Sequence, residues 1–343
     1  MILVTGGAGF IGSNFIKEYL KNKNESIVNY DKLTYAGNLK NLKKIENNSR
    51  YEFIKGDICD SVKLNEILSK FKPSKIINFA AETHVDKSIK NPENFIKTNI
   101  YGTYKLIEST RNYFNELKNP LKKEFRFIHI STDEVFGSLK KNDPPFNEKT
   151  QFRPNSPYSA SKASSDHLIR SYNKTFNIPS IIVNCSNNYG PFQFPEKLIP
   201  VCILNALQGK EIPIYGEGDN IRDWLYVDDH CRAIQIILDK GKVGETYNVG
   251  GNCELSNLNL VKKICEVMDE IIPRKDGKSY KYFIKFVKDR LGHDYRYSVN
   301  SSKITNELKW KPKVNINDGL KKTINWYIKN QKWISEIQKK AMN

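Results

Sequence analysis

A tyrosine and a lysine in the middle of the chain have a spacing that suits proton transfer. Tyr158 and Lys162 stand four positions apart, so a helix would bring the phenol and the ammonium to one face. A nearby cation stabilises phenolate and lowers the pKa of a tyrosine toward neutrality, which makes the phenol a usable base. Because the chain has 18 tyrosines, a YxxxK match arises by chance, and the pair needs support from its context.

Two adjacent carboxylates form the second reactive group. Asp133 and Glu134 directly follow Thr132 at the end of an apolar run over 125–131. If that run is a buried parallel strand, its carboxyl end lies at the edge where doubly wound folds bind ligands. A carboxylate pair there suits a general acid and a general base with separated pKa values, and Thr132 would hydrogen-bond the substrate. The alternative interpretation is a solvated turn or a helix N-cap.

A glycine-rich segment near the N-terminus has the features of a phosphate-binding loop. Gly6, Gly9 and Gly12 follow a strand candidate over 2–5 and precede a helical pattern. Such glycines permit a tight turn and a close approach of pyrophosphate to the helix N-terminus. Asp31 closes the next strand, where a carboxylate binds the adenosine ribose hydroxyls and favours NAD over NADP. The GxxGxxG spacing is typical of the extended short-chain dehydrogenase superfamily.

The sequence pattern in the rest of the first half of the chain predicts the strands and helices that would position these groups. Short β-branched runs alternate with amphipathic stretches, a pattern of βαβ units. The strand candidates cover 2–5, 26–30, 51–55, 75–79, 125–131 and 179–185, and the helical patterns cover 9–22, 61–71, 93–118 and 157–177. We therefore expect the α/β class, with a doubly wound parallel sheet of the Rossmann type.

The second half predicts a smaller, irregular lobe that is interleaved with the first domain. Proline and glycine become frequent after position 187, and the strand–helix alternation stops, although 256–271 and 317–329 are helical in pattern. The expected divisions are an NAD-binding domain over 1–186 that 229–251 rejoins through a strand, a substrate-binding lobe over 187–228 and 252–330, and a basic tail over 331–343 that frays.

Composition narrows the class of protein. The net charge of +17 permits a nucleic-acid-binding protein on a Rossmann scaffold, but the excess lysines are scattered beside asparagines and form no dense basic block. We therefore expect a solvated lysine surface and an anionic small substrate rather than nucleic acid. The six cysteines are widely spaced and form no CxxC pair, so neither a metal site nor a disulfide framework is expected. The N-terminus lacks a signal-peptide pattern and no apolar run spans a bilayer, which predicts a cytoplasmic protein without membrane contact.

Longer motifs resemble the dTDP-glucose 4,6-dehydratase family over 1–327, nearly the whole chain. They are TGGAGFIG (5–12), DKLTYAGN (31–38), AAETHVDKSI (80–89), STDEVFG (131–137), YSASK (158–162), NCSNNYGPFQFPEKLIP (184–200), RDWLYVDD (222–229), YNVGG (247–251) and DRLGHDYRY (289–297). The chain departs from the family at Phe136, where tyrosine is usual, at Thr83 and Lys87, where serine and arginine are usual, and at Leu291, where proline is usual.

The resemblance implies a redox-neutral lyase. NAD accepts hydride from sugar C4 while Tyr158 takes the hydroxyl proton. Glu134 then removes the C5 hydrogen, and Asp133 protonates the leaving C6 hydroxyl. The hydride returns to C6 while a proton is delivered to C5. The product is a 4-keto-6-deoxy sugar nucleotide that supplies deoxysugar synthesis, including that of rhamnose.

The resemblance also implies the binding residues. Those for NAD are Gly6, Gly9, Phe10, Ile11, Gly12, Asp31, Lys32, Thr34, Asp57, Ile58, Ala80, Ala81, Thr98, Tyr158, Lys162 and Asn188. Those for the substrate are His84, Ser88, Thr132, Asn187, Lys197, Leu198, Arg222, Asn257, Arg290 and His293. Among them, the cations Lys197, Arg222 and Arg290 suit a diphosphate. A homodimer through helices near 93–118 and 157–177 is expected. A UDP-sugar 4-epimerase or a dehydratase of another nucleotide sugar remains the alternative, although an epimerase does not need the carboxylate pair.

Overall fold

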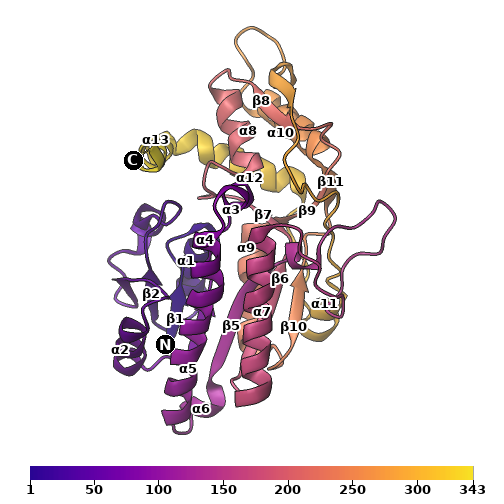
Figure 1. The fold of residues 1–343 in the computed structure, drawn as a ribbon. Coiled ribbons are helices and arrows are strands. Elements are labelled where there is room, and N and C mark those ends of the chain that lie inside the picture. The colour runs from indigo at the N-terminus through magenta and orange to yellow at the C-terminus, as the bar shows by residue number, and fades with distance from the viewer. Residues whose placement is uncertain (343) are drawn as a thin grey trace.

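Seven parallel strands form the central sheet of the computed structural model, which describes residues 1–342. Their order is β10-β6-β5-β4-β1-β2-β3, so the winding reverses between β1 and β4 (Figure 1). The bounds are β1 (Ile2–Thr5), β2 (Ile27–Asp31), β3 (Tyr51–Lys55), β4 (Lys75–Asn78), β5 (Arg126–Thr132), β6 (Ser180–Cys185) and β10 (Thr246–Val249). The predicted doubly wound α/β fold is confirmed, and β10 is the strand that rejoins the sheet from the second half of the chain.

Helices cover both faces of this sheet because its strands are apolar on both sides. Ile2 and Val4 belong to the core under α1 (Phe10–Asn22) and α9 (Val227–Lys240). Leu3 belongs to the opposite core, which α2 (Ser61–Phe71), α5 (Thr103–Glu116) and α7 (Pro157–Phe176) cover. Alternate residues of a strand point to opposite faces, so continuous apolar runs produce a sheet that is buried on both faces.

A second lobe with its own apolar core caps the carboxyl end of the sheet (Figure 1). It contains β7 (Asn187–Tyr189), α8 (Leu198–Leu207), β8 (Ile212–Tyr215), β9 (Ile221–Tyr226), β11 (Glu254–Ser256), α10 (Asn257–Ile271), β12 (Ile284–Val287) and α12 (Ile316–Lys329). The shorter elements of the chain are η1 (Leu39–Ile45), α3 (Val85–Lys90), α6 (Leu121–Glu124), η3 (Asp133–Phe136), η4 (Tyr280–Phe283) and α11 (Ser302–Leu308).

Two helical expectations differ from the structure. The helix expected over 93–118 is divided into α4 (Glu93–Phe95), a π-helical segment η2 (Ile96–Gly102) and α5. The basic tail expected over 331–343 is instead helix α13 (Gln331–Met342), with residue 343 outside the described part. The tail folds because Trp333, Ile334 and Ile337 bury their side chains in the core of the second lobe.

Candidate active site

One cleft lies at the carboxyl end of the sheet, between the two lobes. Its lining comes from the segments that follow β1, β2, β3, β4, β5 and β6, as expected for a ligand site of a doubly wound fold. All sixteen residues expected to contact NAD line this cleft, as do the five residues expected to take part in catalysis. The folded chain therefore gathers, at one place, residues that lie up to 182 positions apart, from Gly6 to Asn188.

The phosphate loop has the shape that a bound pyrophosphate requires. Gly6 has a φ of +70°, and a Cβ there would lie 2.5 Å from the backbone nitrogen of Ala80. At Gly12, a Cβ would lie 2.6 Å from the carbonyl oxygen of Gly6. Asp31 holds the loop from the side, since its Oδ2 accepts a hydrogen bond of 2.8 Å from the backbone N–H of Ala8. These close approaches leave no room for side chains and fit the loop to a dinucleotide.

The carboxylate pair begins a 3-10 turn directly after β5. Thr132 is the N-cap of η3, and its hydroxyl accepts a 3.3 Å bond from the backbone N–H of Glu134. The capping residue is therefore Thr132, and the two carboxylates are left for another role. Asp133 is 1% exposed, and its Oδ2 has no hydrogen-bond partner within residues 1–342. A buried carboxylate oxygen without a partner is costly unless the group carries a proton.

The surroundings of the two carboxylates separate their pKa values. Burial raises the pKa of Asp133 well above its usual range, and the charges of Glu134 and Asp223 raise it further. Burial also raises the pKa of Glu134, but three cations, Lys197, Arg222 and Arg290, oppose that rise. The surroundings therefore favour the protonated form of Asp133 more strongly than that of Glu134. Such a difference between two neighbouring carboxyl groups suits a general acid and a general base.

Helix α7 carries the tyrosine and the lysine into the cleft. Ser156 and Ser159 form a capping box, and Pro157 occupies the first turn, so the helix begins just before Tyr158. Lys162 Nζ donates a 2.8 Å hydrogen bond to the carbonyl oxygen of Ile130. The pair therefore shares one face of the helix, as the spacing indicated.

The expected effect of the lysine on the tyrosine is wrong for this structure. Burial, followed by the charge of Glu134, raises the pKa of Tyr158 well above its usual range, and a hydrogen bond with Thr132 opposes the rise. The sequence spacing predicted a pKa near neutrality because it reports the cation but not the burial of the phenol or the nearby carboxylates. Burial of Lys162 also lowers the pKa of the ammonium itself.

The three cations expected to bind a diphosphate come from separate segments of the second lobe. Lys197 lines the cleft and donates a 2.7 Å bond to the carbonyl oxygen of Thr83. Arg222 stacks at 4.2 Å over the ring of Tyr297, and Arg290 lies 3.5 Å from Asp86. All three act electrostatically on Glu134, which places them around one region of the site.

The loop that carries Arg290 is anchored in spite of the missing proline. Leu291 is 78% exposed, so the departure from the family leaves an apolar side chain in solvent. Asp289 holds the loop through its Oδ1, which lies 2.7 Å from His293 Nδ1 and accepts a 2.8 Å bond from the backbone N–H of Arg290. The Phe136 departure is also accommodated, because its ring stacks on Phe146 in an apolar cluster.

The substrate candidates occupy different places, and their roles stay predictions. Thr132, Asn187 and Lys197 line the cleft, whereas the remaining seven lie outside its lining. Ser88 is fully buried, and its hydroxyl binds the carbonyl oxygen of Val85 and the backbone N–H of Tyr158. Outside the lining are His84, Ser88, Leu198, Arg222, Asn257, Arg290 and His293.

The motif-by-motif assignment missed a carboxylate that joins three loops over the cleft. Glu196 Oε1 accepts a 2.8 Å hydrogen bond from the hydroxyl of Tyr35, and its Oε2 lies 3.5 Å from His84 Nε2 and 3.4 Å from Lys87 Nζ. Both Glu196 and Phe194, which packs edge-on against Tyr35, line the cleft. The only sequence signal was the position of Glu196 beside Lys197 in the PEKLIP segment.

The fold and the site define a Rossmann-type enzyme with a dinucleotide-binding cleft beside a buried pair of carboxyl groups. The family model described as GDP-mannose 4,6 dehydratase matches residues 3–323, and the chain belongs to this family. A dTDP-glucose 4,6-dehydratase of Shigella flexneri is 52% identical over 345 residues, covering 98% of this chain and 95% of the relative. A dTDP-glucose 4,6-dehydratase of Escherichia coli K12 is 51% identical, covering 99% of this chain and 96% of the relative.

Solved structures agree with this assignment. The dTDP-glucose 4,6-dehydratase of Bacillus anthracis in complex with NAD is 44% identical, with a TM-score of 0.87 over 98% of this chain and 99% of that one. The Streptomyces venezuelae enzyme, solved with NAD and TYD bound, is 39% identical, with a TM-score of 0.89 and the same coverage. A UDP-glucose 4-epimerase of Thermotoga maritima reaches a TM-score of 0.84 at 28% identity over 96% of this chain and 99% of that one, so the fold alone does not separate the two activities.

Proposed function

We propose that this chain converts dTDP-glucose to dTDP-4-keto-6-deoxyglucose and water, with NAD as its cofactor. The observation that carries the proposal is the buried Asp133–Glu134 pair, whose different surroundings suit an acid and a base. It stands in a cleft lined by every residue expected to hold the dinucleotide. Relatives about half identical over nearly the full chain, named for this reaction, support the choice of substrate.

The cofactor would supply a hydride acceptor for sugar C4 and return the hydride to C6. The chain's own residues move the protons. Tyr158 would take the proton of the 4-hydroxyl as its phenolate, a form that burial and Glu134 disfavour in the protein alone and that the positive charge of bound NAD and Lys162 would favour. Thr132, which shares a hydrogen bond with the phenol, would orient that hydroxyl. Oxidation at C4 acidifies the C5 hydrogen, which Glu134 removes. Asp133 protonates the departing C6 hydroxyl, so one water leaves. When the hydride returns to C6, a proton returns to C5 from Glu134, and the sugar undergoes no net oxidation.

The binding of substrate would use fixed positive charge. Lys197, Arg222 and Arg290 would hold the diphosphate, since cations positioned by other contacts bind phosphate oxygens strongly. Lys197 is fixed by the carbonyl oxygen of Thr83, and Arg222 by that of Asp294 at 2.9 Å. Binding of the diphosphate would leave Glu134 with weaker compensation from these cations, which would make it a stronger base.

An epimerase would need the cofactor and Tyr158, but it has no step for which Asp133 and Glu134 are required. Incubation of the purified chain with dTDP-glucose and with UDP-glucose, with NAD and without added reductant, distinguishes the activities. We expect a 4-keto product, detected in alkali and by the loss of one water in mass spectrometry, from dTDP-glucose alone. Conversion of UDP-glucose to a 4-epimer without loss of water would refute the proposal.

We also propose a homodimer formed through η2, α5 and α7. Ile96, Tyr101 and Tyr104 are 53%, 46% and 37% exposed along one helical segment, and Phe176 at the end of α7 is 39% exposed. Apolar side chains gathered in this way are typical of interfaces. Tyr104→Glu should convert the dimer to a monomer in analytical ultracentrifugation, and a monomeric parent chain would contradict the proposal.

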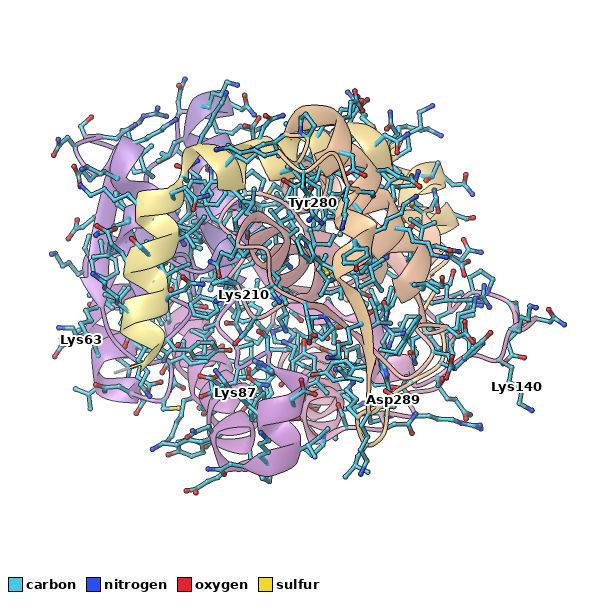
Figure 2. The ribbon with its side chains drawn as sticks, turned by 90° about the horizontal axis from the view of Figure 1, so that it is seen from above. Lys63, Lys87, Lys140, Lys210, Tyr280 and Asp289 are labelled. Carbon is cyan, nitrogen blue, oxygen red and sulfur yellow. The ribbon has the colours of Figure 1, made fainter. Side chains whose placement is uncertain are left out.

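A cytoplasmic location agrees with the six cysteines, all of which are free thiols in the structure. Within residues 1–342, no helix combines the length and the apolar character that a bilayer crossing requires. Cell fractionation with a cytoplasmic marker tests the location, and recovery of the chain outside that fraction would contradict it. The labelled lysines of Figure 2 lie at separate places on the molecule, in agreement with a dispersed surface charge.

A further inference from the structure

Helix α13 leaves the second lobe and lies against the first domain near η1. Figure 1 shows it (yellow) extending from the end of α12 toward the indigo N-terminal segments, and Figure 2 shows it beside them from above. Two polar contacts join it to η1. Trp333 Nε1 donates a 2.8 Å hydrogen bond to Asn41 Oδ1, and Glu336 lies 2.5 Å from Lys40 Nζ.

The contact with Asn41 continues into the phosphate loop. Asn41 Nδ2 donates a 2.9 Å hydrogen bond to the carbonyl oxygen of Ala8, the residue between Gly7 and Gly9. Trp333 is 8% exposed, Asn41 3% and Ala8 0%, so water has little access to the chain of bonds from indole to amide to loop. Hydrogen bonds that are shielded in this way constrain geometry more strongly than exposed ones.

Ala8 is thereby held from both sides. Its N–H donates to Asp31 Oδ2 at 2.8 Å, while its carbonyl oxygen accepts from Asn41 and, at 3.0 Å, from the backbone N–H of Asn38. The position of Ala8 sets the direction of the N–H groups around Gly9 that open α1. These are the groups that a phosphate-binding loop presents to its ligand.

The same Trp333 side chain also packs in the second lobe. Trp333 packs at 4.8 Å from Trp326 and 6.0 Å from Phe192, measured between ring centroids. Phe192 in turn lies 3.3 Å below Lys17 Nζ of α1, and the segment that follows it leads to Lys197. The helix therefore contacts both the cofactor-binding domain and the lobe that carries the substrate residues.

We infer that α13 is a strap that fixes the phosphate loop, and that Trp333 is a positioning residue for the dinucleotide through Asn41 and Ala8. This inference rests on the proposed NAD cofactor. It assigns to the last segment of the chain a contribution to cofactor affinity, although that segment does not line the cleft.

The test compares two Trp→Phe variants of the full chain. Trp333→Phe keeps an aromatic ring in the cluster but removes the indole donor. Trp310→Phe is the matched control, because Trp310 is 0% exposed and its Nε1 donates a 3.2 Å bond to the carbonyl oxygen of Asp229, away from the loop. Isothermal titration calorimetry of the cofactor-stripped proteins measures the Kd for NAD. Circular dichroism and thermal melting verify that both variants fold.

We expect Trp333→Phe to raise the Kd for NAD by about three- to tenfold, the effect of one buried hydrogen bond. We expect Trp310→Phe to leave it unchanged. At saturating NAD, Trp333→Phe should keep the parent kcat and the KM for the nucleotide sugar, which a general loss of stability would not do. Hydrogen exchange at the N–H of Ala8 and Gly9, measured without NAD, should be faster in Trp333→Phe only. Equal Kd values in the parent and both variants, or equal rises in both variants, would overturn the inference.

A second variant tests the same relay from its middle. Asn41→Leu keeps a side chain that branches at Cγ but breaks both bonds, so we expect a rise in the Kd for NAD at least as large as that of Trp333→Phe. The double variant should bind NAD no more weakly than Asn41→Leu, because the indole acts through the amide. Strictly additive effects would overturn the relay. A parent chain that binds NAD but does not dehydrate dTDP-glucose would refute the proposed reaction and leave these binding comparisons valid, whereas a parent chain that binds no NAD would refute both.

Discussion

Replacement of Glu134 by glutamine separates the removal of the C5 proton from the other steps. The amide has the shape of the carboxyl group but cannot accept the proton. A positioned general base contributes about 10²- to 10⁴-fold to a rate, so kcat should fall by about that factor, equivalent to about 3–5.5 kcal/mol. The upper half of this range is expected, because Lys197, Arg222 and Arg290 favour an ionised Glu134 and Asp133, with its pKa held high, is a poor substitute base.

The assay follows two signals in a single turnover with dTDP-glucose. Near-ultraviolet absorbance reports NADH, which should form and persist in Glu134→Gln because oxidation at C4 uses Tyr158. Exchange of the C5 hydrogen with deuterium from the solvent should be lost. Asp133→Asn is the matched comparison: it should keep C5 exchange while water loss slows, since only the acid is missing.

The stability of Glu134→Gln serves as an internal control. Burial raises the folded-state pKa of Glu134, so the stability that this group contributes is present at low pH and is lost as the pH rises through that pKa. Glutamine does not titrate, and the variant should melt no lower than the parent at neutral pH. Product formation at the parent rate in a folded Glu134→Gln protein would refute the assignment of the base. Loss of NADH formation together with product would show that Glu134 is needed before the elimination step.

Three further predictions address the neighbouring groups. Tyr158→Phe should lower kcat by about 10²- to 10⁴-fold and, unlike Glu134→Gln, should form no NADH in a single turnover; NADH at the parent rate would exclude the phenol as base. Lys197→Gln should raise the KM for dTDP-glucose by about tenfold or more, with a smaller change in kcat, because it removes a charge-assisted contact to phosphate; an unchanged KM in steady-state kinetics would place the diphosphate elsewhere. Asp166→Asn should stabilise the protein above its pKa, which burial raises from 3.8 to about 6. The stability that this group contributes is lost as the pH rises through that value, so the gain of the variant in denaturant unfolding should reach about 3 kcal/mol near pH 8 and vanish below about pH 3. A gain independent of pH would show that ionisation of Asp166 is not its cause.

The amino-acid sequence was sufficient to predict the sheet and the place of the cofactor loop. The strand expected over 2–5, the glycines after it and Asp31 form a contiguous βαβ unit, and local period and turn chemistry specify such a unit. The strands expected over 51–55 and 75–79 are present within one residue of their predicted bounds. The sequence pattern did not predict helix α13, which was expected to be a frayed tail. The few apolar residues of this segment stabilise a helix only when they pack against a core that other segments form.

The chemistry of the site depended on contacts between distant segments. No spacing around Asp133 and Glu134 reveals that Asp223 lies near the first and that Lys197 and Arg290 lie near the second. The motif around Tyr158 predicted a nearby cation, but it did not predict the burial that raises the pKa of the phenol. Residue types and spacing therefore predicted which groups the folded chain brings into the cleft. Burial and the approach of charges from other elements set their protonation states, because desolvation and Coulomb energy depend on the folded surroundings rather than on neighbours in the chain.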